Sequence, residues 1–181
     1  MSGEIPESVA AYQTLQPLLS GGDDAREDIV LPGHLDRAGL DFSVASLLLI
    51  DDYLNAVHAH EQTALGSSLL TTIEATAFYV GEIIRRLATG RNYEWVTIGD
   101  DLPQTGGTPP CQMEIGTVRA LRADDGEICL PSRAVLRVIL RGQKARSVQS
   151  FARGAIESTG AAAPAPELPT RAPRGRRSIA A

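Results

Sequence analysis

Carboxylates on two predicted helices are the first side chains in this chain whose type could do chemistry. Asp51 and Asp52 lie on the first of these helices and Glu82 lies on the second. Carboxylates act as general acids and bases, and an enzyme would have to bring them together with His58 or Cys111 in one cleft. No Ser/His/Asp order or nucleotide-binding glycine loop accompanies them. We therefore predict no catalytic residue and take the three carboxylates as candidate contacts for a partner.

Three arginines form the second candidate set. Arg133, Arg137 and Arg141 repeat every four residues, so on a helix they make one continuous basic line. Further basic residues extend this line: Lys144, Arg146 and Arg153. Such a line attracts an acidic protein surface or phosphates, and it can also be the solvated face of an amphipathic helix. Nucleic acid is disfavoured because the chain carries a net charge of −5 and no stacking aromatic side chains accompany the arginines.

Metal and thiol chemistry have little support in the sequence. His58 and Glu61 have the spacing of ligands on one helical face, but His60 points about 200° away from His58 and no second pair completes a site. The predicted hairpin register places Cys111 about 27 Å along its strand from the position opposite Cys129, too far for a disulfide. We predict no metal site and no cofactor.

Residues 102–106 read Leu-Pro-Gln-Thr-Gly, the short signal that sortases cleave in cell-wall proteins. A working signal also needs a secretion signal before it and an apolar membrane helix after it, and we find neither pattern. We interpret the match as a coincidence in a turn-rich loop. No apolar run approaches the roughly 18 residues of a membrane helix. We expect a cytoplasmic protein that does not contact a membrane.

Length and composition fit one domain with a tail. The chain has 181 residues, of which 43% are hydrophobic, too many for a wholly disordered protein. Residues 160–181 are rich in Pro, Ala and Arg, which predicts a disordered tail after a single domain over residues 1–159. Charge is segregated, with 2 basic and 11 acidic residues over 1–61, 5 and 9 over 62–129, and 10 and 2 over 130–181. Unlike ends can attract each other or present two surfaces to partners.

Apolar residues at helical spacing predict helices along most of the chain. The predicted helices cover residues 5–16, 43–61, 68–89, 132–141 and 147–158. Pro17 is expected to end the first helix and Ser132 to cap the fourth. The buried stripe of the third helix is expected to include Leu70 and Leu87, and that of the fourth to include Leu140.

Strands are predicted by alternating apolar residues and by turn residues. They cover residues 92–98, 112–122 and 127–130, with a hairpin turn at Asp124-Asp125-Gly126 and a further short strand at Ile29–Leu31. The predicted fold class is α+β. In it, the helices over 43–61 and 68–89 form an antiparallel pair that packs on a small antiparallel sheet, and further helices follow at the C-terminal end.

One stretch resembles a known family. It reads Leu40-Asp41-Phe42-Ser43, Ser46-Leu47, Asp51 and Leu54, then Tyr79-Val80-Gly81-Glu82, Arg86 and Trp95. This pattern over residues 40–98 resembles a bacterial domain of unknown function of helix–helix–strand type. Some of its members are similar to immunity proteins, the small antidotes encoded beside bacterial toxins. Phe42 stands where that family has tyrosine, and the resemblance brings no catalytic residue.

The segregated charge and the lack of a catalytic motif predict a non-catalytic cytoplasmic protein-interaction module. The resemblance implies a protein of the immunity type that covers a partner's surface. Two alternatives stay open. One is an enzyme with an unrecognised acidic and histidine site, and the other is a nucleic-acid-associated regulator that uses the basic C-terminal helix and tail.

Overall fold

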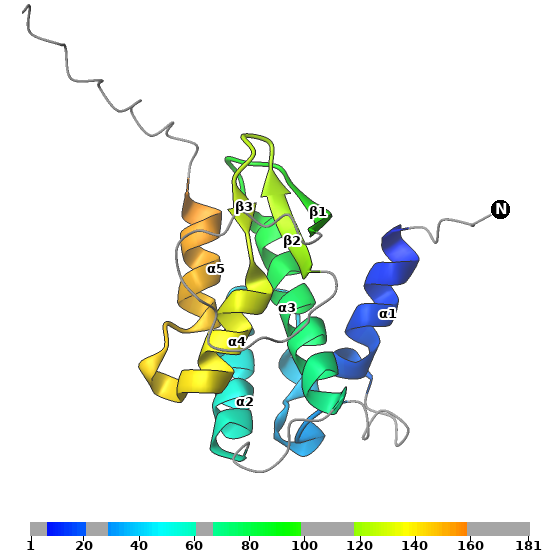
Figure 1. Cartoon of the computed structure of the whole chain (residues 1–181), viewed down its shortest axis with the longest axis vertical. Coiled ribbons are helices and arrows are strands. Elements are labelled where there is room, and N and C mark those ends of the chain that lie inside the picture. Colours follow the sequence, from blue (N-terminus) through cyan, green and yellow to red (C-terminus); the bar gives the residue numbers. More distant parts are fainter. Residues whose placement is uncertain (1–6, 21–28, 61–66, 99–117, 159–181) are drawn as a thin grey trace, which may run out of the picture.

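The computed structural model describes residues 7–20, 29–60, 67–98 and 118–158. Over these residues the chain forms five α-helices and a three-stranded antiparallel sheet (Figure 1), which confirms the predicted α+β class. The predicted tail over 160–181 lies outside the described residues, as do Glu61, Cys111 and the pentapeptide at 102–106.

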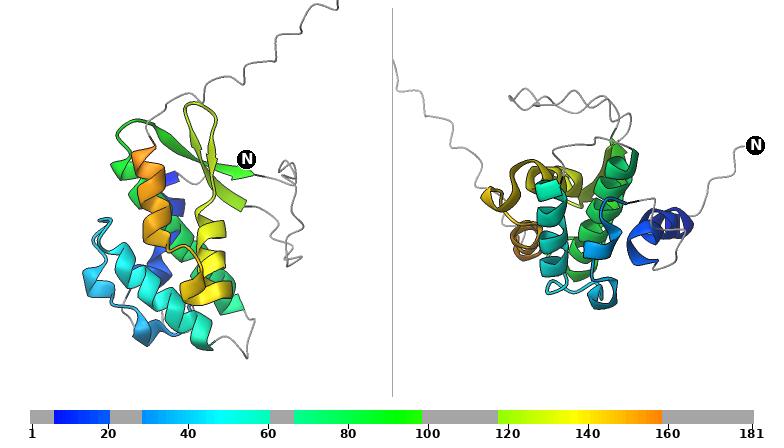
Figure 2. Two further views of the ribbon diagram at one scale, coloured as in Figure 1. Left: turned by 90° about the vertical axis from the view of Figure 1, so that its left-hand side faces the viewer. Right: turned by 90° about the horizontal axis from the view of Figure 1, so that it is seen from below.

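Apart from the predicted strand at Ile29–Leu31, the elements follow the predicted order. They are α1 Glu7–Leu19, α2 Leu47–His60, α3 Ser67–Leu87, β1 Tyr93–Ile98, β2 Val118–Ala123, β3 Ile128–Cys129, α4 Pro131–Arg141 and α5 Val148–Glu157. The sheet lies toward one end of the helices, and α2 lies toward the other (Figures 1 and 2).

Helix α3 is the centre of the fold. It packs against α1, α4, α5 and strand β1. The middle of its predicted stripe is buried, with Ile73 5% exposed and Val80 and Ile84 fully buried. Burying each such side chain contributes about 1.5–3 kcal/mol, so this stripe stabilises the centre of the domain.

Helix α2 is placed mainly by the C-terminal helices. Leu47 and Leu54 are fully buried as predicted, but the most extensive packing of α2 is with α4 and α5, whereas we expected α3 to be its main partner. The segment before α2 links the two long helices by hydrogen bonds. The Tyr53 hydroxyl donates to the Val30 carbonyl, and the Val30 N–H donates to Thr72 Oγ1 at 2.9 Å.

The predicted strand at Ile29–Leu31 is wrong. Leu31 has a φ of 48° and a ψ of 54°, in the left-handed region, so the extended chain cannot continue through it. Ile29 is nevertheless buried, at 3% exposed. The apolar run therefore indicated burial correctly, but a short run of this kind does not distinguish a strand from a buried bend.

Helix α1 continues past its predicted end. It runs to Leu19 with Pro17 inside its last turn, where the ring removes one hydrogen bond, and the Ser20 N–H still donates to the Gln16 carbonyl at 2.8 Å. The added turn buries Leu18 completely. The gain from this apolar contact explains why the proline does not end the helix at Gln16.

The ends and edges of two other helices also differ from the prediction. Helix α4 begins at Pro131 with Leu130 as its N-cap, rather than with Ser132 as the cap, because proline suits the first helical position. Gly142 ends α4 as predicted, with a φ of 55°. Three leucines of the predicted stripes are exposed rather than buried: Leu70, Leu87 and Leu140.

The sheet confirms the predicted hairpin. Strands β2 and β3 join through a turn in which Gly126 has a φ of 85°, a conformation that favours glycine. Leu121 lies opposite Cys129. Strand β1 pairs with the whole length of β2, so the order in the sheet is β1-β2-β3.

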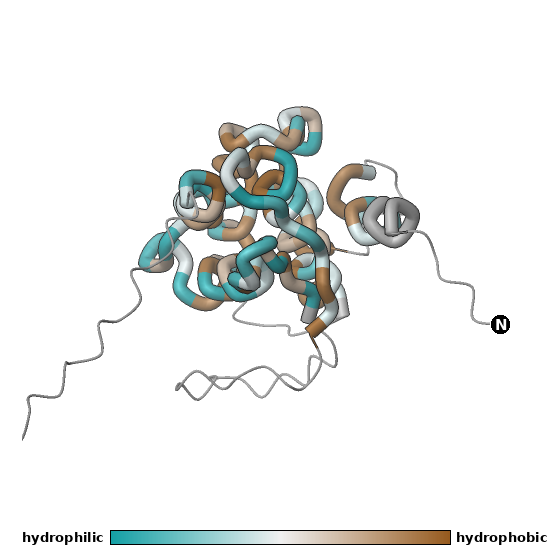
Figure 3. Tube along the Cα trace, turned by 90° about the horizontal axis from the view of Figure 1, so that it is seen from above, coloured by the Kyte–Doolittle hydropathy of each residue, from teal (hydrophilic) through white to brown (hydrophobic). Residues whose placement is uncertain are grey.

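The helices carry both hydrophobic and hydrophilic residues around their turns (Figure 3), as helices that bury one face do. Among the described residues, no helix has the length and apolar character needed to cross a membrane.

Candidate functional site

The carboxylate of Asp51 closes the N-terminus of α5. Asp51 is 7% exposed and accepts hydrogen bonds from the N–H groups of Val148 (2.8 Å) and Gln149 (3.2 Å). The first N–H groups of a helix lack partners within it, and a negative charge there also interacts favourably with the helix dipole. Burial raises the pKa of Asp51, although the two hydrogen bonds oppose this shift. The Asp51 carboxylate therefore serves as a cap for α5 inside the domain.

The other candidates on α2 point to different places. Asp52 is exposed. His58 Nδ1 lies 2.7 Å from the Ile139 carbonyl oxygen in the last turn of α4. A Cβ at Gly142 would come within 2.4 Å of the His58 ring, so the absence of a side chain there makes room for the imidazole. His58 thus attaches α2 to the end of α4 and does not join Asp51.

The buried Glu82 is the centre of an ionic cluster on α3. It is 4% exposed and accepts hydrogen bonds from Arg85 (2.9 and 3.0 Å), Arg86 (3.2 Å) and the indole N–H of Trp95 (2.8 Å). Burial is the largest single influence on its pKa and raises it. The hydrogen bonds and positive charges together outweigh burial and hold the pKa of Glu82 below its usual range. This carboxylate is fully engaged within the molecule.

Aromatic rings cover the Glu82 cluster. Trp95 stacks on Phe78, with ring centroids 4.5 Å apart and an angle of 8° between the rings. The Arg86 guanidinium lies 4.1 Å from the centre of the Phe42 ring, a cation–π contact. Phe42 in turn packs against Tyr79 at 4.7 Å and donates its N–H to the Tyr79 hydroxyl. These contacts fasten β1 and the segment before α2 to the same face of α3.

Gly81 allows Trp95 to lie against α3. A Cβ at Gly81 would come within 2.3 Å of the Trp95 ring and within 3.4 Å of Pro131. Real Cβ atoms do not approach that closely, so a larger residue here would displace the indole. The glycine is explained by close packing.

The residues that carry the family resemblance make many of these contacts. Ser46 Oγ and the Tyr79 hydroxyl share a buried hydrogen bond of 2.8 Å. Phe42 has a φ of 60°, uncommon for a bulky residue, and its contacts with Tyr79 and Arg86 hold it there. The packing of this domain therefore accounts for the pattern over residues 40–98.

The arginines of α4 have different surroundings. Arg133, Arg137 and Arg141 are all exposed. Within the part of the chain that the structure describes, no carboxylate forms an ion pair with them. Arg133 and Arg137 line a pocket together with Arg146, which lies before α5, whereas Arg141 is not among the lining residues.

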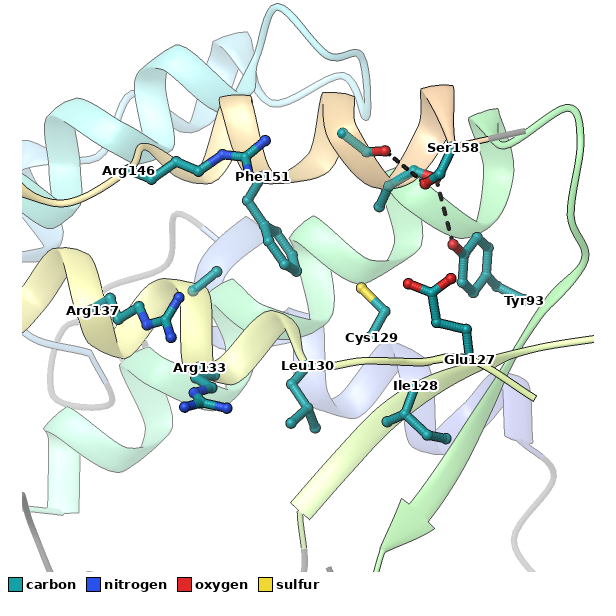
Figure 4. Close-up of a pocket in the computed structure, with 13 residues that line it drawn as sticks. Tyr93, Glu127, Ile128, Cys129, Leu130, Arg133, Arg137, Arg146, Phe151 and Ser158 are labelled. Atoms are coloured by element: carbon teal, nitrogen blue, oxygen red, sulfur yellow. Dashed lines mark hydrogen bonds between the residues drawn. The ribbon is translucent and has the colours of Figure 1, made fainter. Parts of the chain in front are cut away.

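This pocket has a volume of about 400 Å³ and lies between α4, α5 and the end of β3. Figure 4 shows the three arginines gathered at one end and Tyr93, Glu127 and Ser158 at the other. The Phe151 ring and the Cys129 thiol lie between the two ends. We name it the arginine pocket. It offers a basic end, an apolar middle and a polar far end.

The chemistry of the arginine pocket favours binding. Burial raises the pKa of the Cys129 thiol to about 12, so near neutral pH the thiol stays protonated and weakly nucleophilic. Glu127 forms an ion pair with Arg91, which offsets the negative charge at the far end. Three guanidinium groups without carboxylate partners among the described residues can hold a carboxylate or another oxyanion by charge-assisted hydrogen bonds.

Sequence reasoning found the arginines of this pocket but missed two of its other members. Phe151 and Gly154 line the pocket from α5 and were assigned no role beyond a predicted helix. The sequence could have drawn attention to Gly154, because glycine inside a helix destabilises the helix and calls for a local reason. It could not have done so for Phe151, because an aromatic side chain on an amphipathic helix usually belongs to the core.

Comparison of the chain with protein-family models, curated proteins and solved structures found no match. The resemblance over residues 40–98 therefore stays a prediction. Among the described residues, no group of three or more His, Cys, Asp or Glu side chains is arranged to hold a metal ion.

Proposed function

We propose that this protein is a non-catalytic interaction module of the cytoplasm, of the immunity type that the resemblance implies. It binds an acidic surface of a partner protein through its arginine face, which we define as Arg133, Arg137, Arg141 and Arg146. The observation that carries the proposal is the exposure of these guanidinium groups without a carboxylate partner among the described residues.

The local charge supports this assignment. Residues 131–158 contain six basic side chains and one acidic side chain. Such a surface steers an oppositely charged partner and orients it on contact. Arginine is also among the residues that contribute most to binding at protein interfaces.

The acidic candidates support the same choice of surface. Asp51 and Glu82 are buried and accept hydrogen bonds from within the domain, so of the three predicted acidic contacts Asp52 is the exposed one. The basic side of the molecule is therefore the better candidate for the contact with a partner.

Affinity capture with matched charge reversals tests the proposal. The full-length protein and its Arg137→Glu variant are used to capture proteins from a lysate of the source organism at low and physiological salt. We expect a protein captured by the unmodified chain to be lost with Arg137→Glu and to bind less well as salt rises.

The matched control is Arg122→Glu, since Arg122 is an exposed arginine on β2, away from the pocket lining. This variant should capture the partner as the unmodified chain does. Equal capture by Arg137→Glu and the unmodified chain would overturn the proposal. Recovery of DNA or RNA in place of a protein would also overturn it.

A further inference from the structure

Arg146 is held in place over helix α5. Its Nη2 donates a hydrogen bond of 2.7 Å to the carbonyl of Ser150. The same nitrogen lies 2.8 Å from the position that a Cβ would occupy at Gly154. Any side chain at Gly154 would therefore push the guanidinium away from the helix.

Gly154 is costly where it stands. It lies inside α5, and glycine in a helix interior is about 1 kcal/mol less favourable than alanine. It is exposed, so core packing does not require its small size. What occupies the space of the missing Cβ is the Arg146 guanidinium, which lines the arginine pocket. Glycine at position 154 therefore lowers the stability of the helix but leaves room for the Arg146 guanidinium.

The remainder of the pocket complements a peptide better than a simple anion. An inorganic anion would use only the arginine end, whereas the Phe151 ring and the neutral Cys129 thiol offer an apolar wall beside it (Figure 4). Cys129 belongs to β3, which is an edge strand of the three-stranded sheet. An extended peptide can add main-chain hydrogen bonds at such an edge.

We propose that the arginine pocket binds an acidic peptide segment of the partner protein. One carboxylate of the segment is held by Arg133, Arg137 and Arg146, and an adjacent apolar side chain packs against Phe151 and Cys129. Gly154 is the positioning residue that keeps Arg146 within reach of the carboxylate. This inference rests on the proposed function and makes its partner chemistry specific.

Titration of the isotope-labelled full-length chain, followed by nuclear magnetic resonance, tests the inference. The probe is the acetylated and amidated peptide Glu-Glu-Leu-Glu-Glu. Two matched peptides, Gln-Gln-Leu-Gln-Gln and Glu-Glu-Gly-Glu-Glu, remove its charge or its apolar side chain, and inorganic phosphate supplies an anion alone. We expect the first peptide to bind about tenfold more tightly than the other probes. Its chemical-shift changes should fall on residues 127–137 and 146–158.

Two variants make the role of Gly154 testable. Gly154→Ala should weaken binding of the acidic peptide about tenfold while the thermal midpoint stays the same or rises, because alanine favours the helix. Arg146→Gln should weaken binding to a similar extent. The matched control is Gly33→Ala, since a Cβ there meets no atom within 4 Å. This control should bind the peptide as the unmodified chain does.

Several outcomes would overturn the inference. Unchanged peptide binding by Gly154→Ala would show that the glycine does not serve the site. Equal affinity for phosphate or for Glu-Glu-Gly-Glu-Glu would reduce the pocket to a patch that binds any anion. If Arg137→Glu abolishes capture of the partner while Gly154→Ala preserves it, the proposed function stands and the peptide pocket falls. Equal capture by Arg137→Glu and the unmodified chain overturns the proposed function itself.

Discussion

The arginines of α3 and those that line the arginine pocket are the same residue type in opposite surroundings. Arg85 and Arg86 lie within 3.2 Å of the buried Glu82 carboxylate, and the Arg86 guanidinium also lies over the Phe42 ring. The arginines that line the pocket lie on exposed surface, with no carboxylate paired to them among the described residues. An arginine with a carboxylate within reach therefore stabilises the fold, whereas an arginine without one is available to bind a partner.

Two glycines repeat this comparison. Gly81 on α3 leaves room for the rigid Trp95 indole inside the domain, and Gly154 on α5 leaves room for the Arg146 guanidinium at the surface. Adding a methyl group should damage packing at the first position and recognition at the second. This difference separates the Glu82 cluster from the arginine pocket.

The largest effect is expected from Glu82→Gln. This change should lower the free energy of unfolding by about 2–3 kcal/mol, below the full cost of breaking a buried ion pair, because the Arg85 and Arg86 side chains remain 44% and 46% exposed. Urea unfolding at neutral pH measures it. Glu94→Gln, at an exposed position on β1, is the control and should change stability by less than about 0.5 kcal/mol. Equal unfolding midpoints for the two variants would contradict the prediction.

The pH dependence of stability should follow from the same residue. The pKa of Glu82 in the folded state lies below its usual 4.5, so its contribution is complete above that pH and is lost as the pH falls through the folded value. Urea titrations between pH 3 and pH 7 should therefore show a steeper acid loss for the unmodified chain than for Glu82→Gln. Parallel curves would mean that Glu82 has no net ionic role.

Gly81→Ala should be the next most damaging change. The new Cβ forces Trp95 off Phe78 and away from Glu82, and the helix preference of alanine offsets only part of the loss, leaving about 2 kcal/mol. Trp95 is the single tryptophan of the chain, so its fluorescence reports directly on the displacement. Gly33→Ala should leave both emission and stability unchanged. An unshifted emission spectrum in Gly81→Ala would show that α3 accommodates the methyl group.

Asp51→Asn should cost about 1 kcal/mol, the usual contribution of a helix cap. The N–H groups of Val148 and Gln149 donate to different oxygens of Asp51, and an asparagine side chain offers only one acceptor oxygen. Hydrogen exchange at Val148 and Gln149 should accelerate, while Asp52→Asn should leave it unchanged. Because the folded pKa of Asp51 is raised, its contribution is present at low pH and lost as the pH rises, the opposite sense to Glu82. The stability of Asp51→Asn should therefore fall more steeply on acidification than that of the unmodified chain.

The sequence predicted the parts of the fold that depend on local pattern. The apolar stripes of α2 and α3, the hairpin turn at Gly126 and the end of α4 at Gly142 all follow from short-range chemistry. The continuation of α1 through Pro17 and the bend at Leu31 were not predicted, because tertiary burial outweighed the local preference of each segment.

The candidate site was only half predictable for a related reason. Spacing placed the arginines on one face of α4, but it could not reveal that Asp51 and Glu82 turn inward. Partners distant in sequence decide that orientation: the N–H groups of Val148 and Gln149 for Asp51, and the Trp95 indole for Glu82. A list of charged residues in sequence therefore does not separate those that hold the fold from those that face a partner.

The smallest effect on stability is expected from Arg137→Ala. Arg137 is exposed and pairs with no carboxylate among the described residues, so its removal should change the free energy of unfolding by less than about 0.5 kcal/mol. Arg86→Ala is the matched variant in the other region and should cost about 1–2 kcal/mol, because it removes both a bond to Glu82 and the cation on Phe42. Urea unfolding of the two variants under one condition measures the difference. Similar losses of stability would show that the arginine pocket contributes to the fold as the Glu82 cluster does. Arg137 would then not be distinguished from Arg86 as a residue available to a partner.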